Sequence, residues 1–443
     1  MNIEKIFEGR RFHLVAGLLI AISTFLVYSN TFYAGFHFDD TPHIVENYSI
    51  RNLGNWLDIL KGQRGVAMLS FALNYAVGGL NVTGYHIVNL AIHITNGILV
   101  YFLIFLTLNR IDGFKGIAKK IAVYTALLFA VHPIQTQAVT YIIQRMESLA
   151  SMFMLIGLLL FIKGTETSKA AAKVFLYIAV AASYLLGFYS KEIAITLPAI
   201  IILYDYCFLS EGNLKKLVGR WPIYGVLLVI LFFLAAPTFS GLQETPGEAP
   251  SAGAQGIISN PQETPGADVP VSVETPSAGF GVKSITPKEY LFTQFNVLIY
   301  YVTLLFAPVN QNLDYDFPVS KGLFEAPVVN PGTVLNIPLP PPIVSLIILL
   351  AIIGFALYLL IKPPSPPLEK GGKGGILHHG RLIAFFILWF FIILSPTSSF
   401  VPIIDVIFEH RLYLPSVGFF VLFSLAFDRV FEYMNKRKGK IKE

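Results

Sequence analysis

The apolar segment "YHIVNLAIHITNGILVYF", residues 85–102, indicates the class of fold most directly. A helix that crosses a lipid bilayer needs about 20 predominantly apolar residues, and this segment and its neighbours supply them. Four polar side chains recur along it every three or four residues and share one helical face: His86, Asn89, His93 and Asn96. Polar groups at membrane depth face other helices or a wet cavity. The segment therefore predicts a membrane-spanning helix within a bundle.

The composition extends this prediction to the whole chain. The 443 residues are 54% hydrophobic and 13% charged, and the mean hydropathy is +0.64. Soluble domains carry about 25% charged residues, so this composition is that of an integral membrane protein. The net charge of +5 then reflects membrane orientation, and we expect no nucleic-acid partner. A single cysteine, Cys207, excludes an intrachain disulfide.

Ten apolar segments are candidate spans: 13–29, 86–107, 121–137, 147–163, 174–190, 193–210, 221–238, 342–361, 382–398 and 412–431. If the N-terminus lies in the cytoplasm and the spans alternate, the cytoplasmic segments hold 22 of the 32 lysines and arginines. This distribution follows the positive-inside rule. It predicts cytoplasmic termini and two long outer loops, over residues 30–85 and 239–341.

We expect one domain, residues 1–431, with three irregular parts and no tetratricopeptide repeats. A low-complexity insertion at 241–282, rich in Pro, Gly, Ser and Thr, is predicted to be disordered. Residues 362–381 form a cytoplasmic linker, and 432–443 a basic cytoplasmic tail. A further apolar segment would reverse the positive-inside pattern if it spanned, so we predict an outer interfacial or re-entrant helix over about 287–308.

Charged residues of unusual placement gather on the outer side of this topology. Asp39 and Asp40 adjoin each other in the first outer loop. Three cations lie at the outer ends of spans, each near an acid: Arg145 near Glu147, Lys191 beside Glu192, and Arg411 near Glu409 and His410. Each alone is consistent with a structural ion pair. Their convergence on one face beside two acids predicts a pocket for an anion.

Histidines and asparagines lie on the same side. His86 is at the outer end of its span and in reach of the pocket, and His132 ends the third span there. Interhelical hydrogen bonding is the simpler role for His93 and Asn96. Carboxylates and imidazoles are ligands that a divalent metal accepts. No tight ligand spacing such as H-x-x-x-H is present, so we expect no required metal or other cofactor.

Six motifs in order resemble one family: "FHFDDTPHIVEN" (36–47), "GYHIVNLAIHITNGILVY" (84–101), "LLFAVHPIQTQAVTYIIQRMESLASMF" (127–153), "SKEIAITLPAIIILYDY" (190–206), "VTLLFAPVNQNLDYDFP" (302–318) and "SSFVPIIDVIFEHRLYLPSVG" (398–418). They resemble the membrane domain of the transmembrane and tetratricopeptide-repeat proteins and their bacterial relatives. These are C-type (GT-C) glycosyltransferases, the superfamily that includes the protein O-mannosyltransferases.

The resemblance implies an all-α GT-C fold of about ten transmembrane helices. It also implies inverting transfer of a sugar, mannose or another hexose, from a polyprenyl-phosphate-linked donor. The acceptor would be a Ser or Thr hydroxyl of a protein, or a glycolipid. The acidic motif of the first outer loop would be catalytic. Transfer would take place on the periplasmic or lumenal face, for this chain at a bacterial inner membrane.

The chemistry assigns roles to these residues. A carboxylate removes the proton of the attacking hydroxyl, and we expect Asp39 to be this base and Asp40 its orienting partner. The leaving lipid phosphate needs cations, and Arg145, Lys191 and Arg411 are the candidates, with His86. The supporting residues are Asn89, His132, Glu147, Glu192, Glu409 and His410. Two other classes stay open: a transporter or lipid flippase, and a non-catalytic assembly factor.

Overall fold

The computed structural model describes residues 9–240, 278–329 apart from 280, 281 and 283, 338–361 and 375–441. The described parts contain α, π and 3-10 helices and no strand. The longer helices are α2 (Arg10–Tyr28), α4 (Gly65–Gly78), α5 (Val82–Asn109), α6 (Ala118–Val131), α8 (Arg145–Glu166), α9 (Ala170–Phe188), α10 (Leu197–Tyr204), α12 (Trp221–Ser240), α13 (Pro287–Phe306), α14 (Pro342–Ile361), α15 (Gly375–Leu394) and α16 (Ser416–Ile441). The chain is therefore an all-α polytopic membrane protein, as the composition predicts.

Helix α5 is central to the bundle. It packs against α2, α6 and α8, and α8 packs along α9. Two glycines bring α8 and α9 close together: a Cβ on Gly157 of α8 would lie 3.5 Å from the Cβ of Ser183, and one on Gly187 of α9 would lie 3.4 Å from that of Phe153. Small residues of this kind let helix backbones approach closely in membranes. On the other side, α14, α15 and α16 follow one another in space, and α16 closes onto α6.

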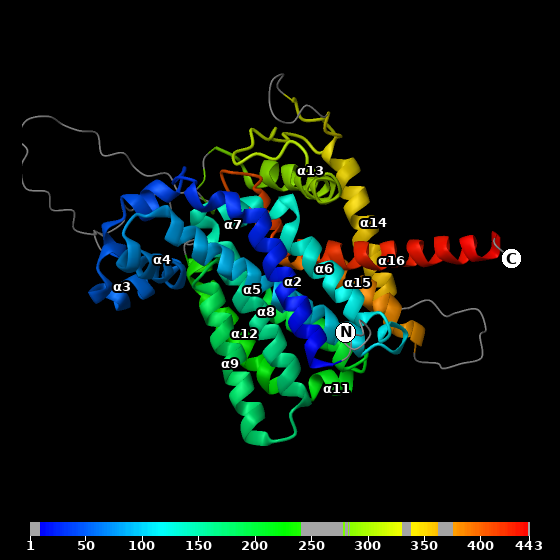
Figure 1. The fold of residues 1–443 in the computed structure, drawn as a ribbon. Coiled ribbons are helices and arrows are strands. Elements are labelled where there is room, and N and C mark those ends of the chain that lie inside the picture. Colours follow the sequence, from blue (N-terminus) through cyan, green and yellow to red (C-terminus); the bar gives the residue numbers. More distant parts are fainter. Residues whose placement is uncertain are drawn as a thin grey trace, which may run out of the picture.

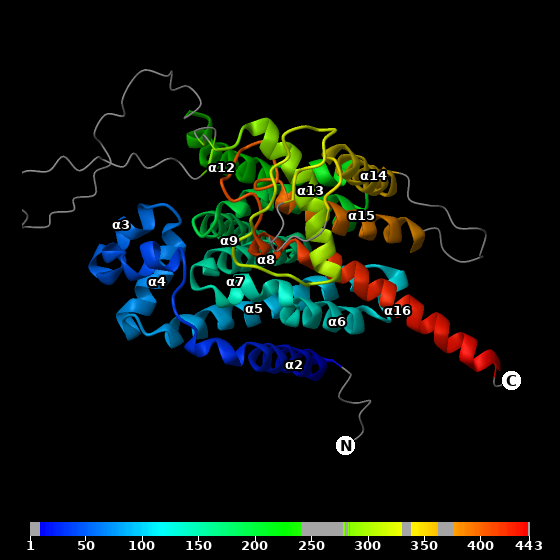
Figure 2. The ribbon, with the colours of Figure 1, turned by 90° about the horizontal axis from the view of Figure 1, so that it is seen from above.

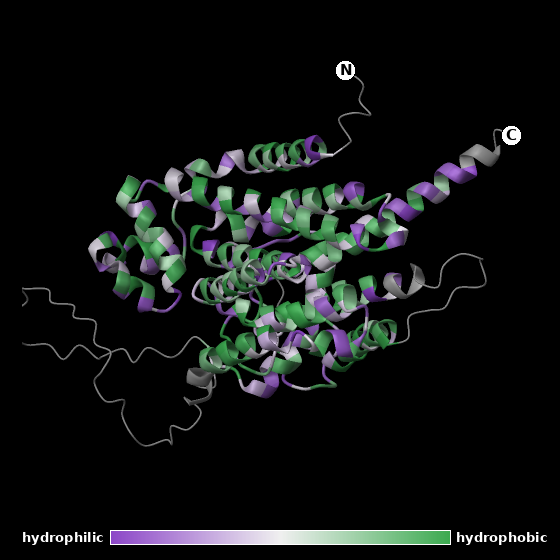
Figure 3. Ribbon diagram, turned by 90° about the horizontal axis from the view of Figure 1, so that it is seen from below, coloured by the Kyte–Doolittle hydropathy of each residue, from purple (hydrophilic) through white to green (hydrophobic). Residues whose placement is uncertain are grey.

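The two ends of the bundle differ. The start of α2 and the end of α16 lie on one side, whereas α3 (Trp56–Lys61) and α4 lie on the opposite side (Figure 2). We call this opposite side the loop end, because the first long loop, residues 34–81, builds it. Hydrophobic residues cover much of α2, and hydrophilic residues follow the last turns of α16 (Figure 3). A common side for both helix ends agrees with the predicted topology, whose membrane orientation stays a prediction.

Every predicted span coincides with helical structure, but the boundaries differ. Six helical segments are long and apolar enough to cross a membrane: Arg10–Tyr33, Val82–Asn109, Ile142–Glu166, Ala170–Phe188, Glu192–Leu209 and Pro342–Ile361. The third predicted span, 121–137, is too long. Helix α6 ends at Val131 because Pro133 forces the preceding His132 into an extended conformation, with ψ of 134°.

The irregular parts also differ from prediction. The linker was predicted to reach residue 381, but α15 begins at Gly375. The basic tail from residue 432 was predicted to be separate from the last span, but α16 continues helically to Ile441. The low-complexity stretch from 241 to 277 and the linker residues 362–374 lie outside the described residues.

Helix α13 occupies the segment that was predicted to be an outer interfacial helix (Figure 1). A capping box between Thr286 and Glu289 starts the helix. Tyr290 and Tyr301 of this helix are fully buried. The Tyr290 hydroxyl donates to the Thr397 carbonyl at 2.6 Å, and that of Tyr301 to the Phe408 carbonyl at 2.9 Å. These side chains therefore join α13 to the segment before α16.

His93 and Asn96, on the polar face of α5, form hydrogen bonds to neighbouring segments, as expected. His93 is fully buried, and its Nδ1 lies 2.7 Å from the hydroxyl of Tyr413, the residue after η11 (Glu409–Leu412). Asn96 donates to the same hydroxyl at 3.0 Å and to the Ser148 carbonyl at 2.8 Å. The predicted interhelical hydrogen bonds are confirmed, and they hold α5, α8 and the η11 segment in one register.

Candidate active site

The two aspartates of the first long loop occupy different environments. Asp40 is 1% exposed, whereas Asp39 is exposed. One carboxylate oxygen of Asp40 accepts from the backbone N–H of Ile143 at 2.7 Å, and the other from that of His37 at 3.0 Å. The backbone N–H of Asp39 donates to the Tyr141 hydroxyl at 2.8 Å. The acidic motif is thus attached to the segment that leads into α8.

The burial of Asp40 changes its ionisation. Removal from water raises the pKa of its carboxyl to about 6, although the N–H donors of His37 and Ile143 oppose this shift. The neighbouring Asp39 adds only a small increase. Asp40 therefore acts as an anchor that joins two segments about a hundred residues apart. The freely exposed carboxylate of Asp39 is the one that a substrate can reach, which fits the roles predicted for the pair.

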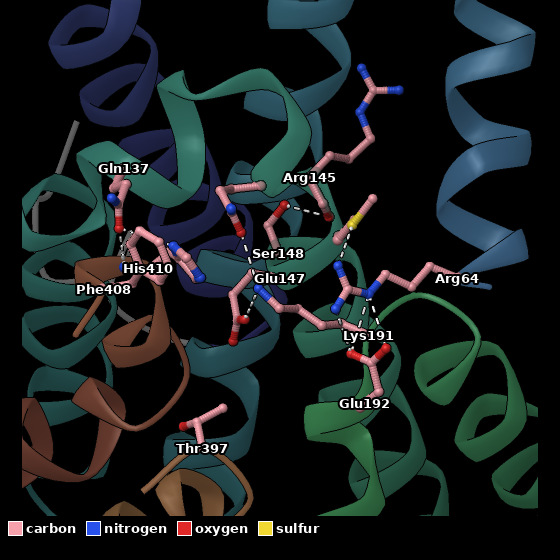
Figure 4. Close-up of polar contacts among 12 residues, drawn as sticks. Arg64, Gln137, Arg145, Glu147, Ser148, Lys191, Glu192, Thr397, Phe408 and His410 are labelled. Carbon is pink, nitrogen blue, oxygen red and sulfur yellow. Dashed lines mark hydrogen bonds and ion pairs between the residues drawn. The ribbon is translucent and has the colours of Figure 1, made fainter. Parts of the chain in front are cut away.

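Lys191, predicted to bind the donor phosphate, is paired with an acid. Its ammonium lies 3.0 Å from Glu147 of α8 and donates to the Gln144 side-chain oxygen at 3.0 Å (Figure 4). The side chain of Glu147 is 1% exposed and that of Lys191 is 13% exposed. Burial lowers the pKa of Lys191, and the carboxylate of Glu147 opposes this change. An ammonium has three donors, and Glu147 and Gln144 take two of them, which leaves one donor that an anion could accept.

The cation beside Lys191 is Arg64, a residue of the first long loop that the sequence analysis did not single out. Its Nε donates to both carboxylate oxygens of Glu192, at 3.0 and 3.2 Å, and its Nη2 donates at 3.0 Å (Figure 4). The backbone of Arg64 is left-handed, with φ of 54°. A Cβ on the next residue, Gly65, would lie 2.2 Å from the Leu60 carbonyl. Backbone conformations of this kind are concentrated at functional sites. In the sequence, only the two glycines of "GQRG" (62–65) indicated an unusual backbone at Arg64.

Arg145 does not join Lys191 in the site. Its side chain points away from the Lys191–Glu147 pair (Figure 4) and is fully buried. The guanidinium donates to Asn89 at 2.6 Å and to the Tyr85 carbonyl at 3.0 Å, and it lies 4.4 Å from the Phe71 ring centre. These neutral partners hold α4, α5 and α8 together. The predicted direct contact of Arg145 with a phosphate therefore does not fit this geometry.

His86 and His132 make no hydrogen bond to Lys191 or Arg64 among the described residues, although His86 lies near Arg145. The Nε2 of His86 lies 3.0 Å from the Ala34 carbonyl, so the ring supports the start of the first long loop. His132 accepts from the Ile134 N–H at 3.2 Å and packs against Phe420. Both rings hold the backbone of the loop end, and neither reaches Lys191. His86 was predicted as a phosphate ligand, and its place in the structure is a supporting one.

The η11 segment brings Arg411 and His410 toward the site. Arg411 donates to the carbonyls of Val406 at 3.1 Å and Asp405 at 2.8 Å. His410 is held by Gln137, whose side-chain oxygen accepts from the His410 backbone N–H at 2.7 Å. Burial, and then the charges of Lys191, Arg411 and Arg64, hold the pKa of His410 well below its ordinary value. The charges of three cations therefore all act on the His410 imidazole.

Glu409 has a different function from the one its neighbours suggested. Its carboxylate accepts from the Tyr315 hydroxyl, from Gln311 at 2.6 Å and from the Asn312 backbone N–H at 2.9 Å. Burial raises its pKa, and these three donors oppose the rise. No ion pair with Arg411 appears among the described residues. Glu409 instead holds the segment after α13 against η11.

A further acid, Asp405, interacts with both Asp314 and the acidic motif. The pKa of Asp405 is raised by burial, then by the carboxylate of Asp314, with a smaller contribution from Asp39. Arg411 opposes these effects. Asp39, Asp314 and Asp405 are all exposed, and they come from three separate segments of the chain. Sequence reasoning missed Asp314 and Asp405, although both lie within the quoted motifs "NLDYDFP" and "IIDVIFEHR".

The site thus has an acidic half and a cationic half. The exposed carboxylate of Asp405 interacts with those of Asp39 and Asp314, and three cations act on His410: Lys191 is paired with Glu147, Arg64 is paired with Glu192, and Arg411 interacts with Asp405. Among the residues that the structure describes, no three His, Cys, Asp or Glu side chains lie close enough together to hold a metal ion. A carboxylate that accepts a proton beside cations that attract an anion suits the displacement of an anionic leaving group.

Fold and site define an integral membrane protein with a polar reaction centre at one end of a helical bundle. No protein-family model and no solved structure matches the chain. Three of the proteins that do match are named protein O-mannosyl-transferases. TMTC2 of Homo sapiens is 29% identical over 223 residues, which are 46% of this chain and 26% of the relative. F38B6.6 of Caenorhabditis elegans is 33% identical over 175 residues, 36% of this chain and 25% of the relative. TMTC4 of Homo sapiens is 26% identical over 231 residues, 46% and 31% respectively.

These similarities confirm the resemblance to the transmembrane and tetratricopeptide-repeat family that the motifs indicated. The matched part covers about a quarter to a third of the length of these curated relatives. The similarity therefore concerns part of each relative.

Proposed function

We propose that this protein is a glycosyltransferase that moves a hexose from a polyprenyl-phosphate-linked donor to an acceptor hydroxyl. The names of the relatives support sugar transfer, with mannose as the sugar and a protein as the acceptor. A glycolipid hydroxyl would undergo the same chemistry. By the positive-inside rule, the loop end faces the periplasm of a bacterial cell and both termini face the cytoplasm.

The reaction is a direct displacement at the anomeric carbon. The acceptor oxygen forms a bond to this carbon as the bond from the carbon to the phosphate oxygen breaks. The proton of the acceptor hydroxyl passes to the carboxylate of Asp39. The bonding electron pair leaves with the polyprenyl phosphate, and a single displacement inverts the anomeric configuration. Asp40 positions Asp39 through the backbone of the motif, because its own oxygens are occupied by His37 and Ile143.

The developing charge on the phosphate needs donors that are already in place. Lys191 and Arg64 supply ammonium and guanidinium groups at one edge of the site, each oriented by its carboxylate partner. Arg411 lies behind them, with its guanidinium on the carbonyls of Asp405 and Val406. Its charge acts through space, which does not require contact with the phosphate.

One observation carries this proposal. The backbone N–H of Ile143, two residues before Arg145, donates to Asp40 at 2.7 Å. This bond joins the acidic motif to the beginning of α8, whose Glu147 binds Lys191 at 3.0 Å. The acceptor-side acid and the phosphate-side cations are therefore attached to the same short segment, as a displacement reaction needs.

The test is sugar transfer by the full chain in phospholipid nanodiscs. The donors are synthetic polyprenyl phosphates carrying radiolabelled mannose, glucose or galactose, and the acceptors are a Ser/Thr-rich peptide and a glycolipid. Asp39→Asn should lower turnover by about 10²–10⁴-fold, the usual contribution of a general base. The matched control is Asp316→Asn, an exposed acid of the same end, which should retain activity. Absence of transfer from all three donors would overturn the proposed function. Full turnover of Asp39→Asn would show that Asp39 is not the base.

A further inference from the structure

The first long loop contains a cavity to which the reaction described above assigns no group of the substrate, although Arg64 lines it. Its volume is about 390 Å³, within the range of small-molecule sites. The lining residues come from five helical elements between His43 and Met68, the last of them α4, and Met146 at the start of α8 also lines the cavity. The cavity is a bowl that is open on one side, at the loop end of the bundle.

The position of this bowl links the two halves of the site. His43 lines one part, and its Nδ1 lies 2.9 Å from the backbone carbonyl of Asp39. Arg64 lines another part, and it binds Glu192, the residue that follows Lys191. A molecule in the bowl therefore lies against a residue that contacts the backbone of the acidic motif and against the first cation of the cationic half.

The chemistry of the lining suits a polyhydroxylated ring. Asn55, Gln63 and Ser49 present neutral amide and hydroxyl groups that can both donate and accept. Sugar hydroxyls need this mixed character, because each of them is a donor and an acceptor at once. One carboxylate, that of Asp58, also lines the bowl, and it is 81% exposed.

Arg64 provides an anion-binding group at one part of the bowl. Its Nε and Nη2 are taken by Glu192, whereas within the described part of the chain Nη1 contacts only the Met146 sulfur, at 3.5 Å. A thioether is a weak acceptor, so this edge of the guanidinium has unused donor capacity in the cavity. A phosphate or another oxygen anion would satisfy it with a charge-assisted bond.

We propose that this bowl binds the hexose ring of the lipid-linked donor, with the sugar phosphate directed toward Arg64. The inference rests on the proposed function and names the place of the donor sugar within it. Asn55 and Gln63 bind ring hydroxyls, and Arg64 binds the phosphate oxygen. The ring then lies between the acidic motif and the cations, so the anomeric carbon is close to both.

The experiment measures binding of soluble headgroups to the full chain in nanodiscs by ligand-observed saturation-transfer NMR. The probes are the 1-phosphates of mannose, glucose and galactose, with inorganic phosphate as the reference. Asn55→Ala and Gln63→Ala should each weaken the preferred hexose phosphate about fivefold, the factor expected for one hydrogen bond. Neither should change the binding of inorganic phosphate. Asn55 precedes α3 without a capping bond, so its replacement removes no structural contact of that kind. Asn30→Ala, an exposed amide outside the bowl, is the matched control.

Three results would overturn the inference. In the first, none of the hexose phosphates binds more tightly than inorganic phosphate. In the second, the best hexose phosphate binds both variants as tightly as it binds the unchanged protein. In the third, the two variants raise the KM for the acceptor peptide and leave the donor KM unchanged, which would assign the bowl to the acceptor. Transfer by the unchanged protein separates this inference from the proposed function: if transfer occurs and the donor KM is the same in both variants, only the inference fails. If no transfer occurs but hexose phosphates bind in the bowl, the proposed reaction fails and the sugar site stands.

Discussion

The buried carboxyl of Asp40 predicts opposite pH dependences of stability and activity. Its pKa is about 6 in the folded protein and 3.8 in the unfolded chain. Between these values the folded state binds more protons than the unfolded state, so the free energy of unfolding falls as pH rises through this window. The full difference corresponds to about 3 kcal/mol, of which about 2 kcal/mol falls between pH 4.5 and 7.

Activity should change in the other direction. The anionic carboxylate of Asp40 accepts from His37 and Ile143 on its two oxygens. A protonated carboxyl donates from one oxygen, so one of these N–H groups loses its acceptor and the acidic motif is held less firmly. We therefore expect kcat/KM to rise as pH rises through about 6 while thermal stability declines.

The assay compares unfolding midpoints and transfer rates of the full chain at several pH values between 4.5 and 7. Asp40→Asn cannot titrate, so the difference in slope between it and the unchanged protein isolates this carboxyl from other raised acids such as Asp405. Asp39→Asn is the control, because its exposed side chain should leave the stability slope intact. Equal stability slopes for Asp40→Asn and the unchanged protein would refute the reasoning.

Three other results are expected. Lys191→Met should lower the free energy of unfolding by about 3–5 kcal/mol because it leaves Glu147 buried and unpaired; adding Glu147→Leu should restore most of the stability measured by thermal unfolding but not the transfer, and failure of the second change to restore it would contradict the pairing. Arg64→Gln should lower kcat/KM, and the corresponding loss of transition-state stabilisation should be about 1.5–3 kcal/mol, the range for a charged hydrogen bond. An unchanged kcat/KM would remove Arg64 from the site. Cysteines introduced at Lys115 and Asp316 should react with membrane-impermeant reagents only from the cytoplasm and only from outside, respectively, and the reverse pattern would invert the topology.

The fold was largely predictable because hydrophobicity is a local property of the sequence. Each predicted span required only an apolar run of sufficient length, and every run proved helical. The helix boundaries were wrong where particular residues end or extend a helix independently of its hydrophobicity. Pro133 ends α6 early, and the charged residues after position 431 extend α16 as a helix that hydropathy alone does not detect.

The site was predictable only in part, because partners are set by tertiary contacts. The sequence placed Lys191, Arg145 and Arg411 near the loop end. Whether a side chain turns toward the site or into the bundle depends on what lies beside it, and Arg145 turns toward Asn89 and Phe71. Arg64 escaped notice because an arginine in a polar loop is ordinary until its left-handed backbone and its Glu192 partner are seen.

The cations of the loop end fall into two groups with different consequences for an anionic ligand. Lys191 and Arg64 are each matched by a carboxylate, so their net charge is small although their donors are accessible. Arg145 and Arg411 are held by carbonyls, an amide side chain and aromatic rings, which satisfy hydrogen bonds without cancelling charge, although the carboxylate of Asp405 offsets part of the charge of Arg411. Their positive field therefore persists at the site, where low-dielectric surroundings strengthen it. The pairs supply contacts of defined geometry and the unpaired arginines supply the potential, so that a phosphate is favoured over a neutral ligand before it touches any residue.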